Sequence, residues 1–236
     1  MISTLPVHYM ELEHIYRQLE KRHSKSVAIT SCHNQSGSSM LAYSLSKRYQ
    51  ADGYKVLLVD LNIQNPSLNL SLGLARDEWD AGASCMKSIC APSANGTHFL
   101  PAPVGNTASL SFRNQNVLAQ TIEEWLQHYD RVVMDTSPLN ASNYRNIPAQ
   151  SACAEADASL LLVRSGFTTR NQLEESCQLL QEVKANLLGC IMNDRDQPSL
   201  TDELYRENRR LERFFPKVSA RIKRWIDSSA LLNLRV

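Results

Sequence analysis

The polar loop after the first apolar run contains residue types that can hold phosphate. From residue 31 to residue 40 it reads SCHNQSGSSM. Gly37 is small enough for backbone N–H groups to wrap around phosphate oxygens, and the Ser39 hydroxyl can bind a magnesium ion. The helix expected next would direct its positive N-terminal end at the same place. Ser38 stands where such a loop has its phosphate-binding lysine, so the loop predicts a phosphate site without its main cation.

Other polar residues follow the later apolar runs of the chain. Asp60 and Asp135 end the runs 55–60 and 131–135. Asn193 ends the run 187–193, and Arg195 lies two residues beyond it. Ligands of open parallel sheets bind beyond the carboxyl ends of the strands. These four residues and the loop 33–39 therefore form the candidate site.

Short apolar runs alternate with amphipathic helical patterns. Strands are expected over residues 27–31, 55–60, 97–101, 131–135, 158–164 and 187–193. Helices are expected over residues 11–22, 117–128 and 171–184, and another after the polar loop, where Leu41, Leu45 and Tyr49 have helical spacing. Buried strands that alternate with helices predict an α/β fold, with a parallel sheet covered by helices on both faces.

Composition excludes several classes of protein. The 236 residues are 43% apolar and 21% charged, which is enough to bury the core of one domain over residues 1–236. No apolar run approaches the roughly 20 residues that a bilayer span needs, and no secretory signal opens the chain, so a cytoplasmic protein is expected. The six cysteines have irregular spacing without a zinc-site pattern, and we interpret them as reduced thiols.

Five segments in the same order resemble the MinD/ParA superfamily of deviant P-loop proteins. They are residues 31–40, 56–68, 129–138, 156–168 and 188–193, and the segment 97–105 is also similar. Among such proteins the chain looks most similar to the cytoplasmic domain of bacterial polysaccharide-export tyrosine kinases (Wzc/CpsD-like), over about residues 13–193. This resemblance implies a P-loop NTPase-like, three-layer fold that is also Rossmann-like.

The chain departs from this family at positions that carry charge. Ser38 replaces the P-loop lysine, which makes the Walker A loop degenerate, and His33 occupies the position of the second, signature lysine of MinD and ParA. Asn62 replaces the second acid of the D-x-D pair, and Gln64 replaces an arginine. Phosphoryl transfer needs positive charge on the γ-phosphate and a held magnesium ion, so efficient hydrolysis is not expected.

A replacement cation would have to come from elsewhere in the chain. Lys47 and Arg48 are about nine residues further along the helix, roughly 14 Å away at 1.5 Å per residue, and are expected to face outward at its far end. Arg164 or Arg195 would have to reach in from other strand ends.

The resemblance also implies roles for the residues that are retained. Asp60 and Asp135 would be the catalytic residues, vestigial or weak, and together with Ser39 they would hold Mg²⁺. The implied cofactor contacts are Gly37, Ser38, Ser39, Asn193 and Arg195. Asn193 matches the residue that reads the adenine edge in relatives. Two alternatives stay open: ATP or ADP binds with Mg²⁺, or these are inherited capping and turn residues and the site binds no nucleotide.

Both ends of the chain have patterns of their own. An N-terminal helix is expected within residues 1–24, where Glu13 and Arg17 have the spacing of an ordinary surface ion pair. Residues 200–236 are expected to form a basic amphipathic helical tail, because residues 206–224 carry eight basic and two acidic side chains. Its apolar face would comprise Val218, Ile222, Trp225, Ile226 and Leu232, with Phe214 and Phe215 before a kink at Pro216.

The tail has three interpretations. It docks on the domain with its basic face in water, it binds an anionic membrane surface through residues 217–233, or it binds nucleic acid, which is the least favoured because the patch is narrow. The first interpretation gives the tail no binding partner and is the favoured one.

Our leading hypothesis is a catalytically degenerate protein that acts as a binding or regulatory partner in exopolysaccharide synthesis or export. It would dock on a protein of that machinery, with a homodimer across the nucleotide face as one arrangement. The alternatives are a slow ATPase or tyrosine kinase and a membrane-positioning protein of the MinD kind. These functions follow from the resemblance, and the polysaccharide context is weaker than the fold assignment.

Overall fold

The computed structural model describes residues 5–91, 97–105, 107–141, 146–194, 200–212 and 215–228. The chain divides into two compact units, Met1–Asn193 and Asp194–Val236. The first unit contains a β-sheet and its covering helices, and the second contains two helices. The single domain expected over residues 1–236 stays a prediction.

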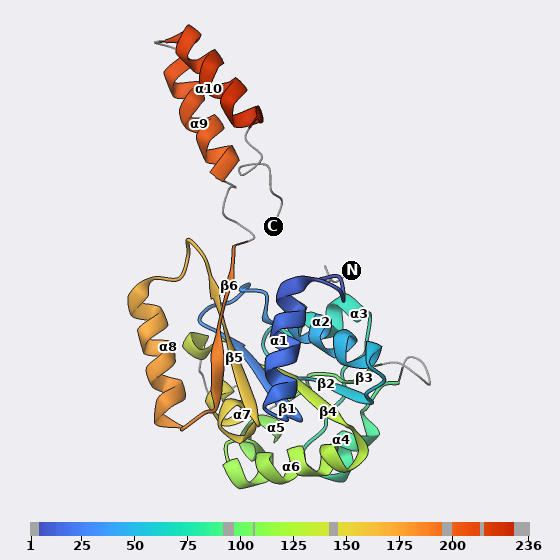
Figure 1. Ribbon diagram of the computed structural model, residues 1–236. Helices are drawn as coiled ribbons and strands as arrows, with labels where there is room; N and C mark the ends of the chain where they lie inside the picture. Colours follow the sequence, from blue (N-terminus) through green and yellow to red (C-terminus); the bar gives the residue numbers. More distant parts are fainter. Residues whose placement is uncertain are drawn as a thin grey trace. The chain divides into compact units, whose positions relative to one another are not determined.

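A six-stranded parallel sheet forms the centre of the first unit (Figure 1). The strand order is β3-β2-β4-β1-β5-β6. The strands are β1 (Ser26–Ser31), β2 (Val56–Asp60), β3 (His98–Leu100), β4 (Arg131–Asp135), β5 (Ala158–Arg164) and β6 (Leu187–Asn193). All six were expected from the apolar runs, which confirms the α/β fold with a parallel sheet.

The expected helices are present, together with several short ones. The helices of the first unit are α1 (Met10–Lys21), α2 (Ser38–Ala51), α3 (Ser67–Leu72), α4 (Ala83–Lys87), α5 (Thr107–Ser111), α6 (Gln115–His128), α7 (Ala149–Glu155) and α8 (Arg170–Glu182), with a 3₁₀ turn, η1 (Leu139–Ala141). Side chains cap the N-termini of two of these helices. Asn114 caps α6, and Thr169 forms a capping box with Gln172 at the start of α8.

Two apolar clusters lie on opposite faces of the sheet. Val56 and Leu58 of β2 pack with the buried residues of α1 and α2, whereas Leu57 and Val59 pack with those of α6 and α7. This alternation follows from the two-residue side-chain period of a strand. The result is three layers, with α1 and α2 on one side of the sheet (Figure 1). The layers hold the carboxyl ends of the strands in place.

Arg48 fastens α1 to α2. Its guanidinium pairs with Glu13 at 2.7 Å and with Asp52 at 2.7 Å, and it lies 3.9 Å from the ring centre of Tyr16. Only 13% of the Arg48 side chain is exposed, so the expectation that Arg48 faces outward is wrong. The cause is the pair of carboxylates that neutralise the cation against α1. Arg17, by contrast, forms the expected i,i+4 surface pair with Glu13.

The second unit is a pair of packed helices, α9 (Leu200–Glu212) and α10 (Pro216–Ser228). Asn208 of α9 donates from Nδ2 to the carbonyl of Ser219 at 3.1 Å, and Ile226 is buried. Trp225 and Val218 are exposed, so the apolar face expected for this segment divides between an inner and an outer side. Phe214 and Leu232 lie outside the described residues. None of the described helices has both the length and the apolar character to span a bilayer.

Candidate functional site

The two candidate catalytic carboxylates lie side by side at the end of the sheet. Asp60 ends β2, Asp135 ends β4, and the two residues are register partners in these adjacent strands. Both are fully buried. Asp60 Oδ1 accepts from the backbone N–H of Asn62 at 2.9 Å, while Asp60 Oδ2 and both Asp135 oxygens have no hydrogen-bond partner among the described residues. Buried carboxylate oxygens of this kind favour either a proton or a cation.

The environment of the pair disfavours its charged form. Burial raises the pKa of Asp135 to about 7, although the nearby Ser39 and Ser38 hydroxyls oppose the shift. Burial, and next the negative charge of Asp135, hold the pKa of Asp60 well above its usual range. Two carboxyl groups this close titrate as a pair. The pair therefore carries less than its full charge of −2 at neutral pH.

Gly37 and the two serines join the loop to α2. Gly37 has φ +97°, a left-handed conformation, and is the N-cap residue of α2, which begins at Ser38. The Ser67 hydroxyl donates to Ser39 Oγ at 2.6 Å, which links the start of α2 to the start of α3. Ser38 and Ser39 thus lie next to the carboxyl pair, as the sequence predicts. No lysine replaces the missing one at this first turn of the helix.

Asn193 packs directly on the loop. Its Nδ2 donates to the carbonyl of Ser36 at 2.9 Å. A Cβ atom added at Gly37 would lie 2.7 Å from this nitrogen, so the close approach requires glycine. The structure therefore brings Asn193 to the predicted site. Its expected contact with adenine stays a prediction, and Arg195 lies outside the described residues.

His33 ties the loop to two other elements of the same chain. Its Nε2 lies 3.0 Å from Gln172 Oε1 and its Nδ1 lies 2.6 Å from Asn140 Nδ2. A ring that donates from Nε2 and accepts at Nδ1 satisfies both partners, which is the neutral tautomer. Gln172 Oε1 also accepts from the N–H and the hydroxyl of Thr169 in the capping box of α8. His33, which stands where MinD and ParA have their signature lysine, thus makes contacts within its own chain.

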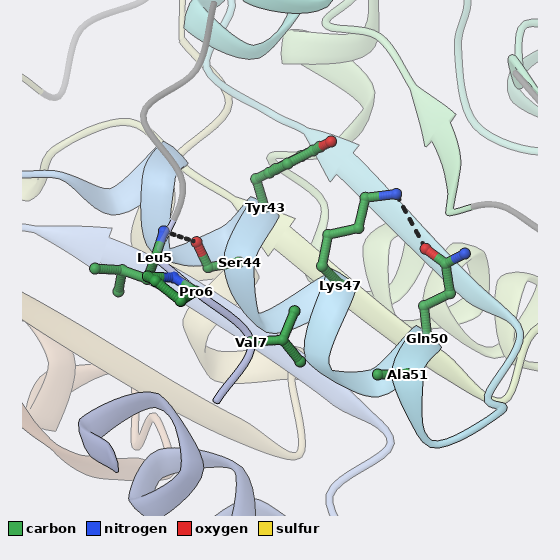
Figure 2. Close-up of a pocket in the computed structure, with 8 residues that line it drawn as sticks. All are labelled: Leu5, Pro6, Val7, Tyr43, Ser44, Lys47, Gln50 and Ala51. Carbon is green, nitrogen blue, oxygen red and sulfur yellow. Dashed lines mark hydrogen bonds between the residues drawn. The ribbon is translucent and has the colours of Figure 1, made fainter. Parts of the chain in front are cut away.

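Lys47 does not supply the missing charge. Its ammonium donates to Gln50 at 3.0 Å, and its pKa is lowered by burial. Figure 2 shows Lys47 in a separate surface pocket on α2, together with Tyr43 and the segment from Leu5 to Val7. Its placement agrees with the outward direction expected from the sequence.

Arg76 is the cation that sequence reasoning missed. It donates from Nε to the carbonyl of Ala102 at 2.9 Å and from Nη2 to that of Ile63 at 3.3 Å, and it also bonds the carbonyl of Pro103. Its charge lowers the pKa of Asp60, against the larger effects of burial and of Asp135. Arg76 lies in an irregular segment with no periodic pattern, so its approach to the site has no signal in the sequence.

A cavity of about 380 Å³ opens beside the carboxyl pair. It lies between the polar loop, the segment after β2 and the segment after β4. Six of its eight lining side chains are carboxamides. The lining residues are Asn34, Gln35, Asn62, Gln64, Asn65, Pro138, Ala141 and Asn146. The sequence pointed to the loop and to the segment after β2, but not to Asn146.

The residues fit a magnesium ion better than they fit a triphosphate. Carboxylate and hydroxyl oxygens are the ligands that Mg²⁺ takes in proteins, and Asp60, Asp135 and Ser39 would supply them. The ion, when bound, would neutralise negative charge on phosphate oxygens. The triphosphate itself would meet Ser38 where a lysine is needed, and no charged side chain among the described residues that line the cavity.

No protein-family model matches the chain. The tyrosine-protein kinase YwqD of Bacillus subtilis is 30% identical over 182 residues, and the match covers 74% of each chain. The chain belongs to the bacterial tyrosine-protein kinase family. Another member, the putative tyrosine-protein kinase CapB of Staphylococcus aureus, is 24% identical over 180 residues, which are 72% of this chain and 75% of CapB. The resemblance expected from the five segments is confirmed.

Solved structures confirm the fold of this tyrosine-kinase family member. The kinase domain of Escherichia coli tyrosine kinase ETK superposes with a TM-score of 0.63 at 22% identity, covering 79% of this chain and 73% of that chain. Cobyrinic acid a,c-diamide synthase from Mycobacterium smegmatis, solved with a bound ATP analog and magnesium, gives 0.59 at 16% identity and covers 72% of each chain. These similarities establish a P-loop NTPase-like fold.

Proposed function

We propose that this family member is a catalytically degenerate P-loop ATPase or kinase-like protein that acts as a binding or regulatory partner in exopolysaccharide biosynthesis or export. One observation carries the proposal: Ser38 stands at the first turn of α2, beside two buried carboxyl groups whose pKa values are raised. A nucleotide here would lose a charge-assisted hydrogen bond to its phosphates, worth about 1.5 to 3 kcal/mol. The chain would therefore bind ATP or ADP with Mg²⁺ only weakly, or it would bind no nucleotide.

Calorimetric titration with ATP and magnesium tests this proposal. The natural chain is expected to show no micromolar binding, whereas Ser38→Lys is expected to gain at least tenfold in affinity, because the lysine restores the phosphate contact. Ala51→Lys is the matched control, since it adds the same charge at the far end of α2. Micromolar binding by the natural chain would contradict the proposal.

The enzyme alternative is a slow ATPase or tyrosine kinase that takes its cation from a partner subunit. It predicts phosphate release or autophosphorylation that Asp60→Ala and Asp135→Ala abolish, because these carboxylates would hold magnesium and position the attacking group. Turnover that depends on protein concentration would also support the homodimer expected across this face. Absence of turnover at every concentration would eliminate this alternative.

A role at the membrane surface is a second candidate function, favoured by α10. Phe215, Val218 and Trp225 are each more than half exposed and share one side of the helix by their spacing. Arg221, Lys223 and Arg224 are exposed close by. Aromatic and cationic side chains together suit an anionic lipid surface, with about 1 kcal/mol per cation near it.

Vesicle sedimentation tests the membrane role. The full chain is expected to bind vesicles containing phosphatidylserine and to release them in high salt, whereas Phe215→Ser/Trp225→Ser should bind at least tenfold less, because apolar burial is lost. Vesicles of phosphatidylcholine alone are the control for charge. Equal binding by the variant and the natural chain would reject this role.

A further inference from the structure

The cavity lined by carboxamides has the chemistry of a site for an uncharged ligand rich in hydroxyl groups. We infer that this cavity, next to the degenerate nucleotide loop, binds a neutral carbohydrate. The inference rests on the proposed function, in which this site does not turn over nucleotide and can therefore take another ligand.

The described side chains of the cavity favour such a ligand over an anion. Each carboxamide offers two N–H donors and one carbonyl acceptor, and each sugar hydroxyl offers one donor and an acceptor oxygen. None of the eight lining residues is charged. Ionisable groups lie close to this lining: the N–H of Asn62 bonds the Asp60 carboxyl group, Arg76 donates to the carbonyl of Ile63, and His33 precedes Asn34 in the loop. Any negative charge on this carboxyl group repels phosphate and does not repel a neutral sugar.

Asn146 and Asn62 are the buried carboxamides of the cavity wall. They are 2% and 6% exposed. Asn146 donates from Nδ2 to the carbonyl of Ala141 at 3.3 Å, but its Oδ1 is buried without a hydrogen-bond partner among the described residues. An unpartnered buried acceptor is costly, and a hydroxyl donated by a ligand at this wall would satisfy it. Asn146 is therefore the lining residue whose hydrogen-bonding capacity the described residues leave unmet.

Asn62 is held in place by its own neighbours. Its Oδ1 accepts from the N–H of Asn65 at 3.2 Å, which fixes the carboxamide and leaves its Nδ2 as a donor without a hydrogen-bond partner among the described residues. Asn34, Gln35 and Gln64 are exposed at the rim. Their side-chain amides make no hydrogen bond with other described residues, so they are available for a ligand.

Saturation-transfer difference NMR on the full chain tests the inference. The probes are the neutral sugars glucose, galactose, mannose and N-acetylglucosamine, with glucuronic acid as the charged counterpart. We expect at least one neutral sugar to give signals, and glucuronic acid to give weaker ones than glucose. No signal from any neutral sugar would overturn the inference, as would equal or stronger binding of glucuronic acid.

Three variants locate the binding site. Asn146→Ala is expected to weaken sugar binding about tenfold, and Gln64→Ala about threefold, because each removes a ligand contact. Gln127→Ala, an exposed carboxamide near the end of α6, should leave binding unchanged. The Gln64 side chain is exposed and makes no hydrogen bond with other described residues, so its variant tests the site even if Asn146→Ala fails to fold. Unchanged sugar binding by folded Gln64→Ala would overturn the location.

The nucleotide titration separates this inference from the proposed function. Micromolar ATP binding by the natural chain would reject the proposed function, and displacement of the sugar by that ATP would also reject the inference. Absence of both ATP binding and sugar binding would reject the inference alone.

Discussion

Asp135 is the clearest case of a side chain whose burial disfavours its charged form. An unfolded aspartate has a pKa near 3.9, whereas burial raises the pKa of folded Asp135 to about 7. The folded state therefore binds more protons than the unfolded state between these two pH values. By linkage, the contribution of Asp135 to stability is present below about pH 4 and is lost as the pH rises to about 7.

Asp135→Asn is therefore expected to stabilise the protein at alkaline pH. The free energy of unfolding should rise by about 2 kcal/mol at pH 8, because the amide needs no buried charge, and the gain should shrink toward pH 5. Urea unfolding at both pH values measures the difference. Asp77→Asn, at an exposed carboxyl, is the control and should have no such pH-dependent effect. A loss of stability at pH 8 would show that the pair is charged and satisfied.

The prediction of the site succeeded where a residue ends a regular element. Asp60 and Asp135 end adjacent strands, so the rule about strand ends was sufficient to bring them together. Arg76 and Asn146 belong to irregular segments, whose path depends on tertiary contacts with no periodic trace in the sequence. Sequence reasoning therefore found the acids and missed both the nearby cation and the buried amide.

At the scale of elements, the contact of α1 with α2 depends on one buried guanidinium. Arg48→Ala should lower the free energy of unfolding by about 1 to 2 kcal/mol, because it removes packing on Tyr16 as well as two ion pairs. Arg17→Ala is the matched control, since Arg17 pairs with the same Glu13 but is 75% exposed. It should have little effect. Equal losses in the two variants, measured by urea unfolding, would contradict this role for Arg48.

Element boundaries were predicted well where apolar runs have polar ends. The strands β4, β5 and β6 have the expected bounds, and β1 is one residue longer than expected. The helices α3, α4, α5 and α7 were not predicted, because their five to seven residues are too short for a helical period to be recognised. Pro66 is the N-cap residue of α3, where its missing N–H costs nothing.

At the scale of the whole molecule, the buried apolar clusters draw all their described members from the first unit. Deletion of residues 194–236 is therefore expected to leave the thermal midpoint of residues 1–193 within about 3 °C of that of the full chain, since the described members of both clusters all remain. Scanning calorimetry of both chains measures this. A fall of more than about 10 °C would mean that the second unit stabilises the first.

One side-chain oxygen of Gln172 contacts both the start of α8 and the nucleotide loop. Gln172 Oε1 accepts from the N–H and the hydroxyl of Thr169 and also lies against His33, so the loop and the start of α8 share one acceptor. A ligand that displaced His33 would remove one contact of this oxygen and leave the capping box of α8 in place. The start of α8 should therefore stay helical when the loop is occupied.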